Sequence, residues 1–193
     1  MKLIYKGRFD GHPETMPQGP DHPGAVAFRE ADTLGRMALQ ANGLALAIMV
    51  PLLMMVAAIN PAALGFDMAI GALASLAAML PHELLHALVF RDTVYLYVYL
   101  SKGMAFVYGT EPMSRGRFVL MSLLPNIVLG LVPLAAFVWR PQDGWLGIMA
   151  VIDLGGGAGD YLNAWHALTQ MPTGTLTYMK GMGSYWYMPA KRA

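Results

Sequence analysis

Residues 68–90 read MAIGALASLAAMLPHELLHALVF, an apolar stretch whose only ionisable side chains are His82, Glu83 and His86. About 20 apolar residues are enough for a helix to cross the hydrocarbon layer of a bilayer. An ionisable side chain at that depth costs about 2.5–3.5 kcal/mol, so such side chains mark functional sites. This stretch therefore predicts a membrane-spanning helix that carries a functional site.

Three further apolar stretches have similar lengths, at residues 37–59, 118–139 and 145–171. Hydrophobic residues make up 56% of the chain and charged residues 13%, whereas soluble domains contain about 45–50% and about 25%. The connections at 60–67 and 140–144 are short, which favours antiparallel neighbours. The sequence thus predicts a mainly α, integral membrane protein with four transmembrane helices in contact with the lipid bilayer.

The lysine and arginine residues orient this bundle. Five lie in the N-terminal segment, four between Arg91 and Arg117, and three in the C-terminal tail, whereas the other two loops share only Arg140. Cytoplasmic loops of membrane proteins carry such an excess. We therefore expect a multi-pass protein of the cell membrane with the N- and C-termini and the middle loop in the cytoplasm.

Three parts are expected along the chain. Residues 1–36 form a polar cytoplasmic segment, residues 37–171 the four-helix membrane domain, and residues 172–193 a cytoplasmic tail. Asp32-Thr33 is typical of a helix start. Residues 2–6 and 25–28 are expected to form short strands.

The middle loop is expected to contain a small β-hairpin at about residues 93–109. Residues 94–100 and 104–108 are rich in aromatic and aliphatic side chains, and Ser101-Lys102-Gly103 supplies turn chemistry between them. The hairpin is either an interfacial element with aromatic anchors or a sheet edge that captures an extended peptide.

Composition excludes several classes of site. The chain has no cysteine, so a disulfide framework or a thiolate metal site is excluded. A net charge of +1 provides no basic face, and we expect no nucleic-acid partner. A bound metal must therefore be held by His, Asp or Glu side chains.

His82, Glu83 and His86 form a His-Glu-x-x-His motif. Residues four apart lie on one face of a helix, so both imidazoles can reach a single Zn²⁺ ion. Glu83 lies on the adjoining face, where it can act as base toward a metal-bound water. The alternative is a structural role, in which the three side chains only hydrogen-bond to neighbouring helices.

A catalytic zinc site needs a third protein ligand, with the fourth position left for water. Depth in the membrane favours Asp160, which lies eleven residues before the expected exit of the fourth span, as His82 lies nine residues before Arg91. Asp153 lies roughly 10 Å further toward the outer face, and His166 is the second choice. The glycines between 155 and 159 allow close helix approach and a local break. His12 and His22 are weaker candidates for the third ligand. Asn126 and Asn163 could each contact either a substrate or a neighbouring helix, and the role of Asp153 also stays open.

Together these features resemble the bacterial membrane family described as "putative zincin peptidases". The resemblance rests on MKLIYKG at 1–7, HELLH at 82–86, EPMS at 111–114 with the basic pair that follows, the Leu-Pro and Val-Pro elements at 124–133, and Gly159-Asp160. It implies His82, His86 and Asp160 as zinc ligands and Glu83 as the base. The arrangement is also similar to site-2 proteases, although Asp160 is followed here by Tyr161 and not by glycine.

We therefore expect a zinc-dependent membrane peptidase that acts on a membrane protein or peptide near the cytoplasmic face. An inactive zinc-binding scaffold is the first alternative. A metal transporter or sensor is the second, although the first and third spans contain no ionisable residue that could line a path. The substrate, pathway, metal identity and oligomeric state are not determined by the sequence.

Overall fold

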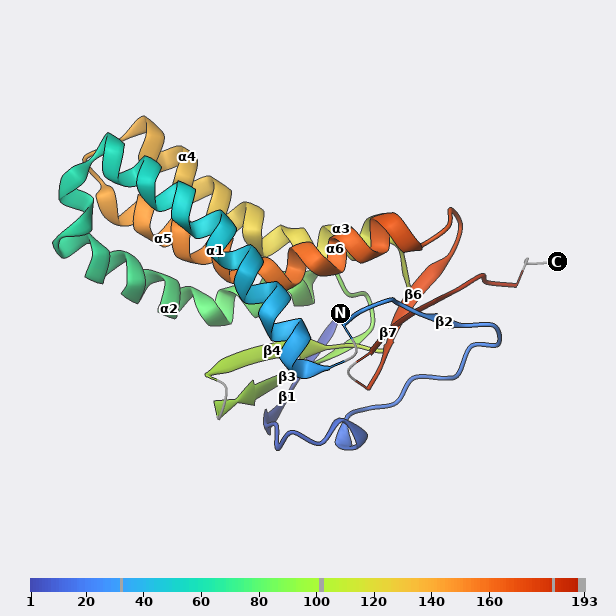
Figure 1. Ribbon diagram of the computed structural model, residues 1–193. Coiled ribbons are helices and arrows are strands. Elements are labelled where there is room, and N and C mark those ends of the chain that lie inside the picture. The colour runs from blue at the N-terminus through green and yellow to red at the C-terminus, as the bar shows by residue number, and fades with distance from the viewer. Residues whose placement is uncertain (32, 101–102, 182, 191–193) are drawn as a thin grey trace. The chain divides into compact units, whose positions relative to one another are not determined.

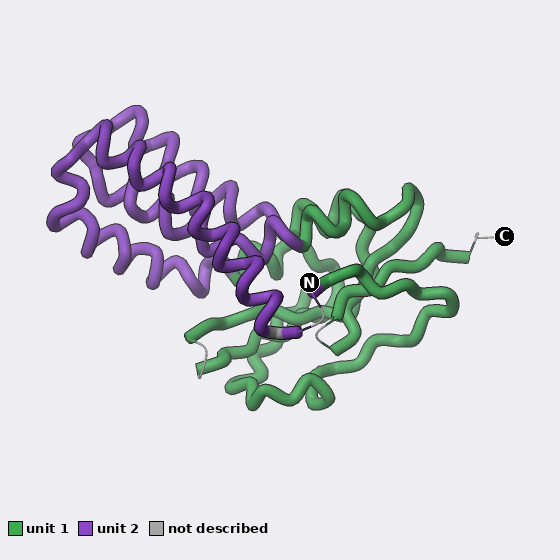
Figure 2. Tube along the Cα trace, in the orientation of Figure 1, with its two compact units in different colours: residues 1–30, 83–122, 163–193 green, residues 31–82, 123–162 purple. Residues whose placement is uncertain are grey.

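The computed structural model describes residues 1–31, 33–100, 103–181 and 183–190. The chain divides into two compact units, each built from separate segments (Figure 2). Unit 1 comprises residues 1–30, 83–122 and 163–193, and unit 2 comprises residues 31–82 and 123–162. Helix α2, Phe66–Leu88, begins in unit 2 and ends in unit 1.

Unit 2 is a bundle of helices (Figure 1). Its first helix is capped by Thr33, whose side chain accepts a hydrogen bond from the Arg36 N–H at 3.3 Å, and this agrees with the expected helix start. Asp32, the other residue of that start, lies outside the described residues. In chain order the helices of the two units together are η1 Pro13–Thr15, α1 Leu34–Ile59, η2 Pro61–Leu64, α2, α3 Arg115–Pro125, the π-helical η4 Asn126–Leu131, α4 Val132–Trp139, α5 Gly144–Gly156 and α6 Ala158–Gln170. Like α2, the helices α3 and α6 belong partly to unit 1.

Within the described part of the chain, three helices are long and apolar enough to cross a membrane, at residues 35–59, 66–88 and 115–139. The fourth expected span, residues 145–171, differs from the prediction because it is not one helix. It is interrupted at Gly157 and consists of α5 and α6, which have 13 residues each. The run Gly155-Gly156-Gly157 explains the interruption, since glycine is a poor helix former.

Close packing in unit 2 depends on small residues. The core contains Val56, Ala63, Phe137, Ile148 and Val151. A Cβ added to Gly147 would lie 3.0 Å from side-chain atoms of both Phe137 and Val56. Glycine at such positions lets apolar helices approach closely, so α5 packs against α1 and α4.

The described residues of unit 1 form two small sheets. In the first, β1 Lys2–Arg8 pairs parallel with β3 Thr93–Tyr99, which pairs antiparallel with β4 Met104–Tyr108. The expected hairpin is therefore confirmed, as is the expected strand at residues 2–6. Of its turn, Ser101 and Lys102 lie outside the described residues, and Gly103 has a φ of +61°, which glycine adopts at little cost.

The second sheet joins three distant parts of the chain. Its strands are β2 Val26–Ala27, β5 Met113–Ser114, β6 Leu176–Lys180 and β7 Gly183–Tyr187. β2 confirms the expected strand near residues 25–28, whereas the hairpin β6–β7 was not expected in the C-terminal tail. The strand order is β2-β7-β6-β5.

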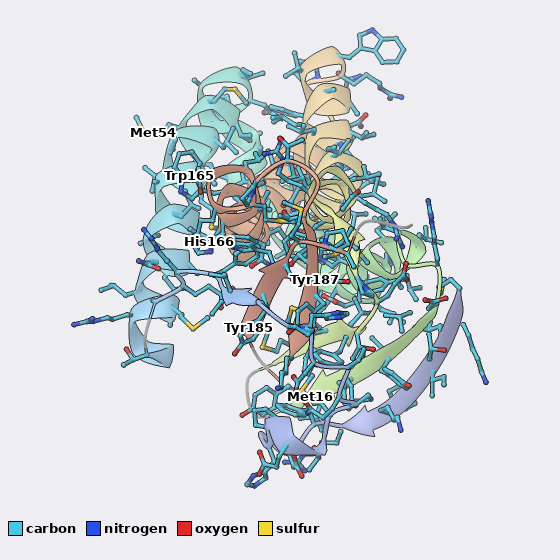
Figure 3. The ribbon with its side chains drawn as sticks, turned by 90° about the vertical axis from the view of Figure 1, so that its right-hand side faces the viewer. Met16, Met54, Trp165, His166, Tyr185 and Tyr187 are labelled. Carbon is cyan, nitrogen blue, oxygen red and sulfur yellow. The ribbon has the colours of Figure 1, made fainter. Side chains whose placement is uncertain are left out.

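The ends of three helices are fixed in the core of unit 1. Ala87 of α2, Phe118 of α3 and Ala167 of α6 are buried in one cluster with Phe28 and Met113. A second cluster lies around Met16 (labelled in Figure 3), with Phe9, Tyr97 and Tyr108. The last two turns of α2 are thus held by the β-rich unit, and these turns carry Glu83 and His86.

Candidate metal centre

Helix α2 brings the three motif residues together. One potential ligand atom from each of His82, Glu83 and His86 lies within 4.8 Å of the other two. Glu83 and His86 are buried, with 9% and 7% of their surface exposed. Among the described residues, this is the group of His, Asp and Glu side chains that could hold a metal ion.

The orientation of His86 is set by α3. Nδ1 of His86 lies 2.7 Å from the backbone carbonyl oxygen of Met121. A carbonyl oxygen can only accept, so Nδ1 carries the hydrogen and the lone pair of the neutral ring is on Nε2. Such a bond to the outer nitrogen of a histidine fixes its ring and its tautomer for metal binding, and Nε2 is the nitrogen suited to ligation.

Asp160 lies beside His82 within unit 2. Oδ2 of Asp160 is 3.4 Å from Nε2 of His82. The same oxygen accepts a hydrogen bond of 2.9 Å from Nδ2 of Asn126. The third ligand expected from the sequence is thus adjacent to the first histidine of the motif, while the group that could hold a metal among the described residues consists of His82, Glu83 and His86.

Glu83 is bound to the edge of the first sheet. Its Oε2 accepts a hydrogen bond of 3.0 Å from the backbone N–H of Val107 in β4. Val107 lies opposite Leu96 in the β3–β4 pair, and because its N–H bonds to Glu83 it points away from β3. Alternation along a strand gives Ala105 the same outward direction. The carboxylate of Glu83 therefore lies at the outer edge of β4.

The chain that follows α2 is held by Glu111 and Arg117. Glu111 accepts hydrogen bonds from the backbone N–H groups of Arg91 and Asp92, at 2.7 and 2.9 Å, and forms an ion pair with Arg117. Arg117 also donates two hydrogen bonds, of 3.1 and 2.9 Å, to the carbonyl oxygen of Val89. This network fixes the C-terminal end of the helix that carries the motif.

The network also controls the ionisation of Glu111. Burial by itself would raise the pKa of Glu111, but the hydrogen bonds from Asp92, Arg117 and Arg91 outweigh it and lower the pKa below 4.5. A lowered carboxyl pKa stabilises the folded state above the pKa of the unfolded chain. This stabilisation is lost as the pH falls through the folded-state value.

We expect Glu111→Gln to lower the free energy of unfolding at neutral pH by about 2 kcal/mol, since hydrogen bonds to charged groups contribute about 1.5–3 kcal/mol. Acidification through the lowered folded-state pKa of Glu111, which lies below 4.5, should remove this difference, because the wild-type carboxylate becomes protonated only there. Thermal unfolding of both proteins at several pH values measures it. A constant difference at all pH values would contradict the role of the carboxylate charge.

The other candidate ligands lie elsewhere. His12 pairs with Glu14, with Nδ1 and Oε1 3.0 Å apart, and His22 stacks on Tyr187 at 3.8 Å between ring centroids. Tyr187 is labelled in Figure 3. The remaining candidates are His12, His22, Asp153 and His166. Among the described residues, none of the four belongs to the group that could hold a metal ion.

His166 and Asp153 each have one buried side-chain atom without a hydrogen-bond partner among the described residues. His166 of α6 (Figure 3) lies with its ring centroid 6.4 Å from that of Phe28, and its Nδ1 has no hydrogen-bond partner among the described residues. Its charged neighbour is Glu30, whose pKa is raised by burial despite hydrogen bonding from Ser184. Asp153 interacts with Ser75, and its Oδ2 likewise has no hydrogen-bond partner in the described part of the chain.

Sequence reasoning missed the residues that hold the motif in place. Glu111 precedes α3 and Arg117 lies in its first turn, and in the sequence this stretch was interpreted only through its positive charges and the family resemblance. Met121 and Val107 act through backbone atoms. A backbone carbonyl leaves no trace in residue type. The only available signal was the acidic Glu111 followed by Arg115 and Arg117, at the entry to an apolar helix.

Comparison with known proteins points to one family. Residues 75–176 match the model of a family described as "Putative zincin peptidase", and the match covers the motif, Asn126 and Asp160. No curated protein and no solved structure matches the chain. The relation to site-2 proteases therefore stays a prediction.

Proposed function

Because the chain belongs to the putative zincin peptidase family, we propose that it is a zinc-dependent peptidase of the cell membrane that cleaves a peptide bond near the cytoplasmic face. The observation that carries the proposal is the convergence of His82, Glu83 and His86 on one helix. We assign His82, His86 and Asp160 as the metal ligands and Glu83 as the catalytic base.

The donor set fits zinc. Two imidazoles and a carboxylate are a common ligand set of catalytic zinc. Two ligand atoms that each lie about 2.0–2.1 Å from a tetrahedral zinc ion are about 3.4 Å apart, and Nε2 of His82 and Oδ2 of Asp160 are 3.4 Å apart. His86 presents the tautomer that leaves Nε2 as its ligating atom, owing to its bond to Met121.

The chemistry follows from these side chains. When bound, zinc supplies a Lewis acid that lowers the pKa of a water molecule to about 7 and polarises a carbonyl group. Glu83 accepts the proton of the attacking water and delivers it to the leaving amide nitrogen. The buried position of Glu83 keeps its carboxylate close to the ligand nitrogens, and the Val107 N–H holds the carboxylate in that position.

The sheet edge next to Glu83 suits an extended substrate. In the edge strand β4, Val107 and Ala105 direct backbone groups away from β3; the Val107 N–H is bonded to Glu83, so a substrate would pair at Ala105. A peptide that adds to such an edge forms backbone hydrogen bonds independent of its sequence. We therefore propose that a membrane protein or peptide is bound there in an unwound, extended conformation.

Several observations support a membrane location. Only 6% of the apolar window of α1 is buried within the protein, and Met54 on α1 (Figure 3) is 68% exposed. A soluble monomer rarely exposes so continuous an apolar surface. Lipid is the environment that would cover it, and α2 and residues 115–139 have comparable length and hydropathy.

Strand pairing supports the proposed orientation. Strands from the N-terminal segment, the middle loop and the C-terminal tail share the two sheets of unit 1, which supports a location of these segments on one side of the membrane. Each intervening segment then crosses an even number of times. Residues 31–82 would cross twice, with α1 and α2. Residues 123–162 would also cross twice, and their second crossing would be formed by α5 and α6 together as a broken helix. Such a break is tolerated where protein surrounds it. The lysine and arginine excess supports the cytoplasm as this side.

The proposal predicts about one zinc ion per chain in purified protein reconstituted into lipid nanodiscs. A fluorogenic library of transmembrane peptides should be cleaved, and phenanthroline should abolish the cleavage until zinc is returned. Metal analysis and the initial rate of fluorescence increase measure both. Cleavage that resists the chelator would contradict the metal mechanism, and zinc binding with no cleavage would favour a scaffold.

A further inference from the structure

We propose that Asn126 is a positioning residue whose side-chain amide holds the carboxylate of Asp160 toward His82, and that Gly157 provides the space for that amide. The inference rests on the proposed function, because it concerns how a zinc ligand is oriented. It assigns roles to two residues that bind neither metal nor substrate themselves.

The hydrogen bond from Asn126 reaches the oxygen that matters. Nδ2 of Asn126 lies 2.9 Å from Oδ2 of Asp160, and this oxygen is the one that lies 3.4 Å from Nε2 of His82. Asn126 is 3% exposed. A buried hydrogen bond to a carboxylate is strong and directional, so it selects one orientation of the Asp160 side chain.

Gly157 is needed for its lack of a side chain. A Cβ built on Gly157 would lie 1.6 Å from Oδ1 and 2.5 Å from Cγ of Asn126, so any other residue would expel the amide. The φ of Gly157 is −73°, which every residue adopts readily. The requirement for glycine at 157 is therefore one of space and not of backbone conformation.

The neighbouring contact repeats this arrangement. A Cβ on Gly130 of η4 would lie 2.5 Å from Leu154 of α5. Leu154 thus fills the space at Gly130, and one turn away Asn126 fills the space at Gly157. The two contacts set the distance between η4 and the chain that leads into Asp160. Asn126 also begins the π-helical stretch, and such stretches occur often at functional sites.

Asp160 lies in the first turn of α6, shortly after the interruption at Gly157. Its N–H donates to the carbonyl oxygen of Gly157 at 2.9 Å, so Gly157 is both the space for Asn126 and the anchor of the turn that carries Asp160. Loss of the amide would leave the carboxylate free to rotate toward other donors. Loss of an outer-shell partner of a metal ligand typically costs about 10–100-fold in metal affinity or activity.

The first test compares Asn126→Leu with Asn60→Leu. Leucine keeps the approximate size of asparagine and removes its donor. Asn60 is the matched control, because its Nδ2 also donates a 2.9 Å hydrogen bond, to the carbonyl oxygen of Pro141, in the same unit. We expect Asn126→Leu to weaken Zn²⁺ binding by about 10–100-fold, measured by chelator competition, and to alter the absorption spectrum of the Co²⁺-loaded protein. Asn60→Leu should change neither.

The second test is a double-variant cycle. Gly157→Ala alone should weaken Zn²⁺ binding about as much as Asn126→Ala alone, because each removes the same hydrogen bond. The double variant should be no weaker than either single variant, since a shared interaction can be lost only once. If the two losses of affinity multiply instead, Gly157 does not act through Asn126.

The outcomes separate this inference from the proposed function. If Asp160→Ala abolishes zinc binding but Asn126→Leu binds zinc with wild-type affinity and an unchanged Co²⁺ spectrum, the positioning role is wrong while the metal site stands. If Asp160→Ala binds zinc as well as wild type does, the proposed ligand set itself is wrong, and the positioning role falls with it.

Discussion

Glu83→Gln is expected to retain zinc and to lose peptide hydrolysis, with a fall in rate of about 10²–10⁴-fold, the usual contribution of a general base. Glutamine keeps the shape of the side chain, and its Oε1 can still accept the hydrogen bond from the Val107 N–H that Glu83 accepts at 3.0 Å. What disappears is the ability to take a proton from water. The initial cleavage rate and the zinc content of the same preparation measure the two effects.

A matched control for this variant is Glu14→Gln. Glu14 is an exposed carboxylate that pairs with His12, far along the chain from the motif. The Glu14→Gln protein should cleave the peptide substrate at the wild-type rate. A Glu83→Gln protein with full zinc content and an unchanged rate would remove Glu83 from the mechanism.

His86→Ala is expected to lose zinc and activity together. It removes a proposed ligand and also the bond to the Met121 carbonyl oxygen, at 2.7 Å. The loss of affinity should exceed the roughly 10–100-fold that removal of an outer partner costs. Metal analysis after dialysis against a weak chelator measures the effect, with thermal unfolding as a check on folding.

Further variants provide a control for this experiment and a test of the alternative third ligand. His12→Ala alters an exposed histidine and should leave zinc content unchanged. His166→Ala tests the second choice for the third ligand, and Asp160→Ala the first. If the His166→Ala protein lost zinc while the Asp160→Ala protein retained it, the proposed ligand set would be contradicted. His166 would then replace Asp160 as the third ligand.

The sequence was sufficient to predict the elements with strong local patterns. Apolar runs predicted α1, α2 and the helix at residues 115–139, and alternation predicted the β3–β4 hairpin. The His-Glu-x-x-His spacing placed His82, Glu83 and His86 on one helix, as found. These predictions succeed because hydrophobic periodicity and helical spacing are local properties of the chain.

Elements that depend on distant partners were harder to predict. The hairpin β6–β7 lies in a segment interpreted as a tail, and its strands form a sheet with β2 and β5. The fourth span was predicted as continuous, although its glycines already suggested a break. Short strands gain stability only from pairing and burial, so their sequence alone is a weak indicator.

The sequence by itself therefore determined the apolar helices, the proposed metal-binding chemistry of the motif and its family. Only the tertiary structure decided how the side chains are held: His86 by a carbonyl oxygen of α3, Glu83 by an N–H of β4, and Asp160 by Asn126 in the space at Gly157. The reason is that residue types and spacings specify which groups a helix presents. Their orientation depends on backbone atoms and vacant volumes contributed by segments far away in the chain.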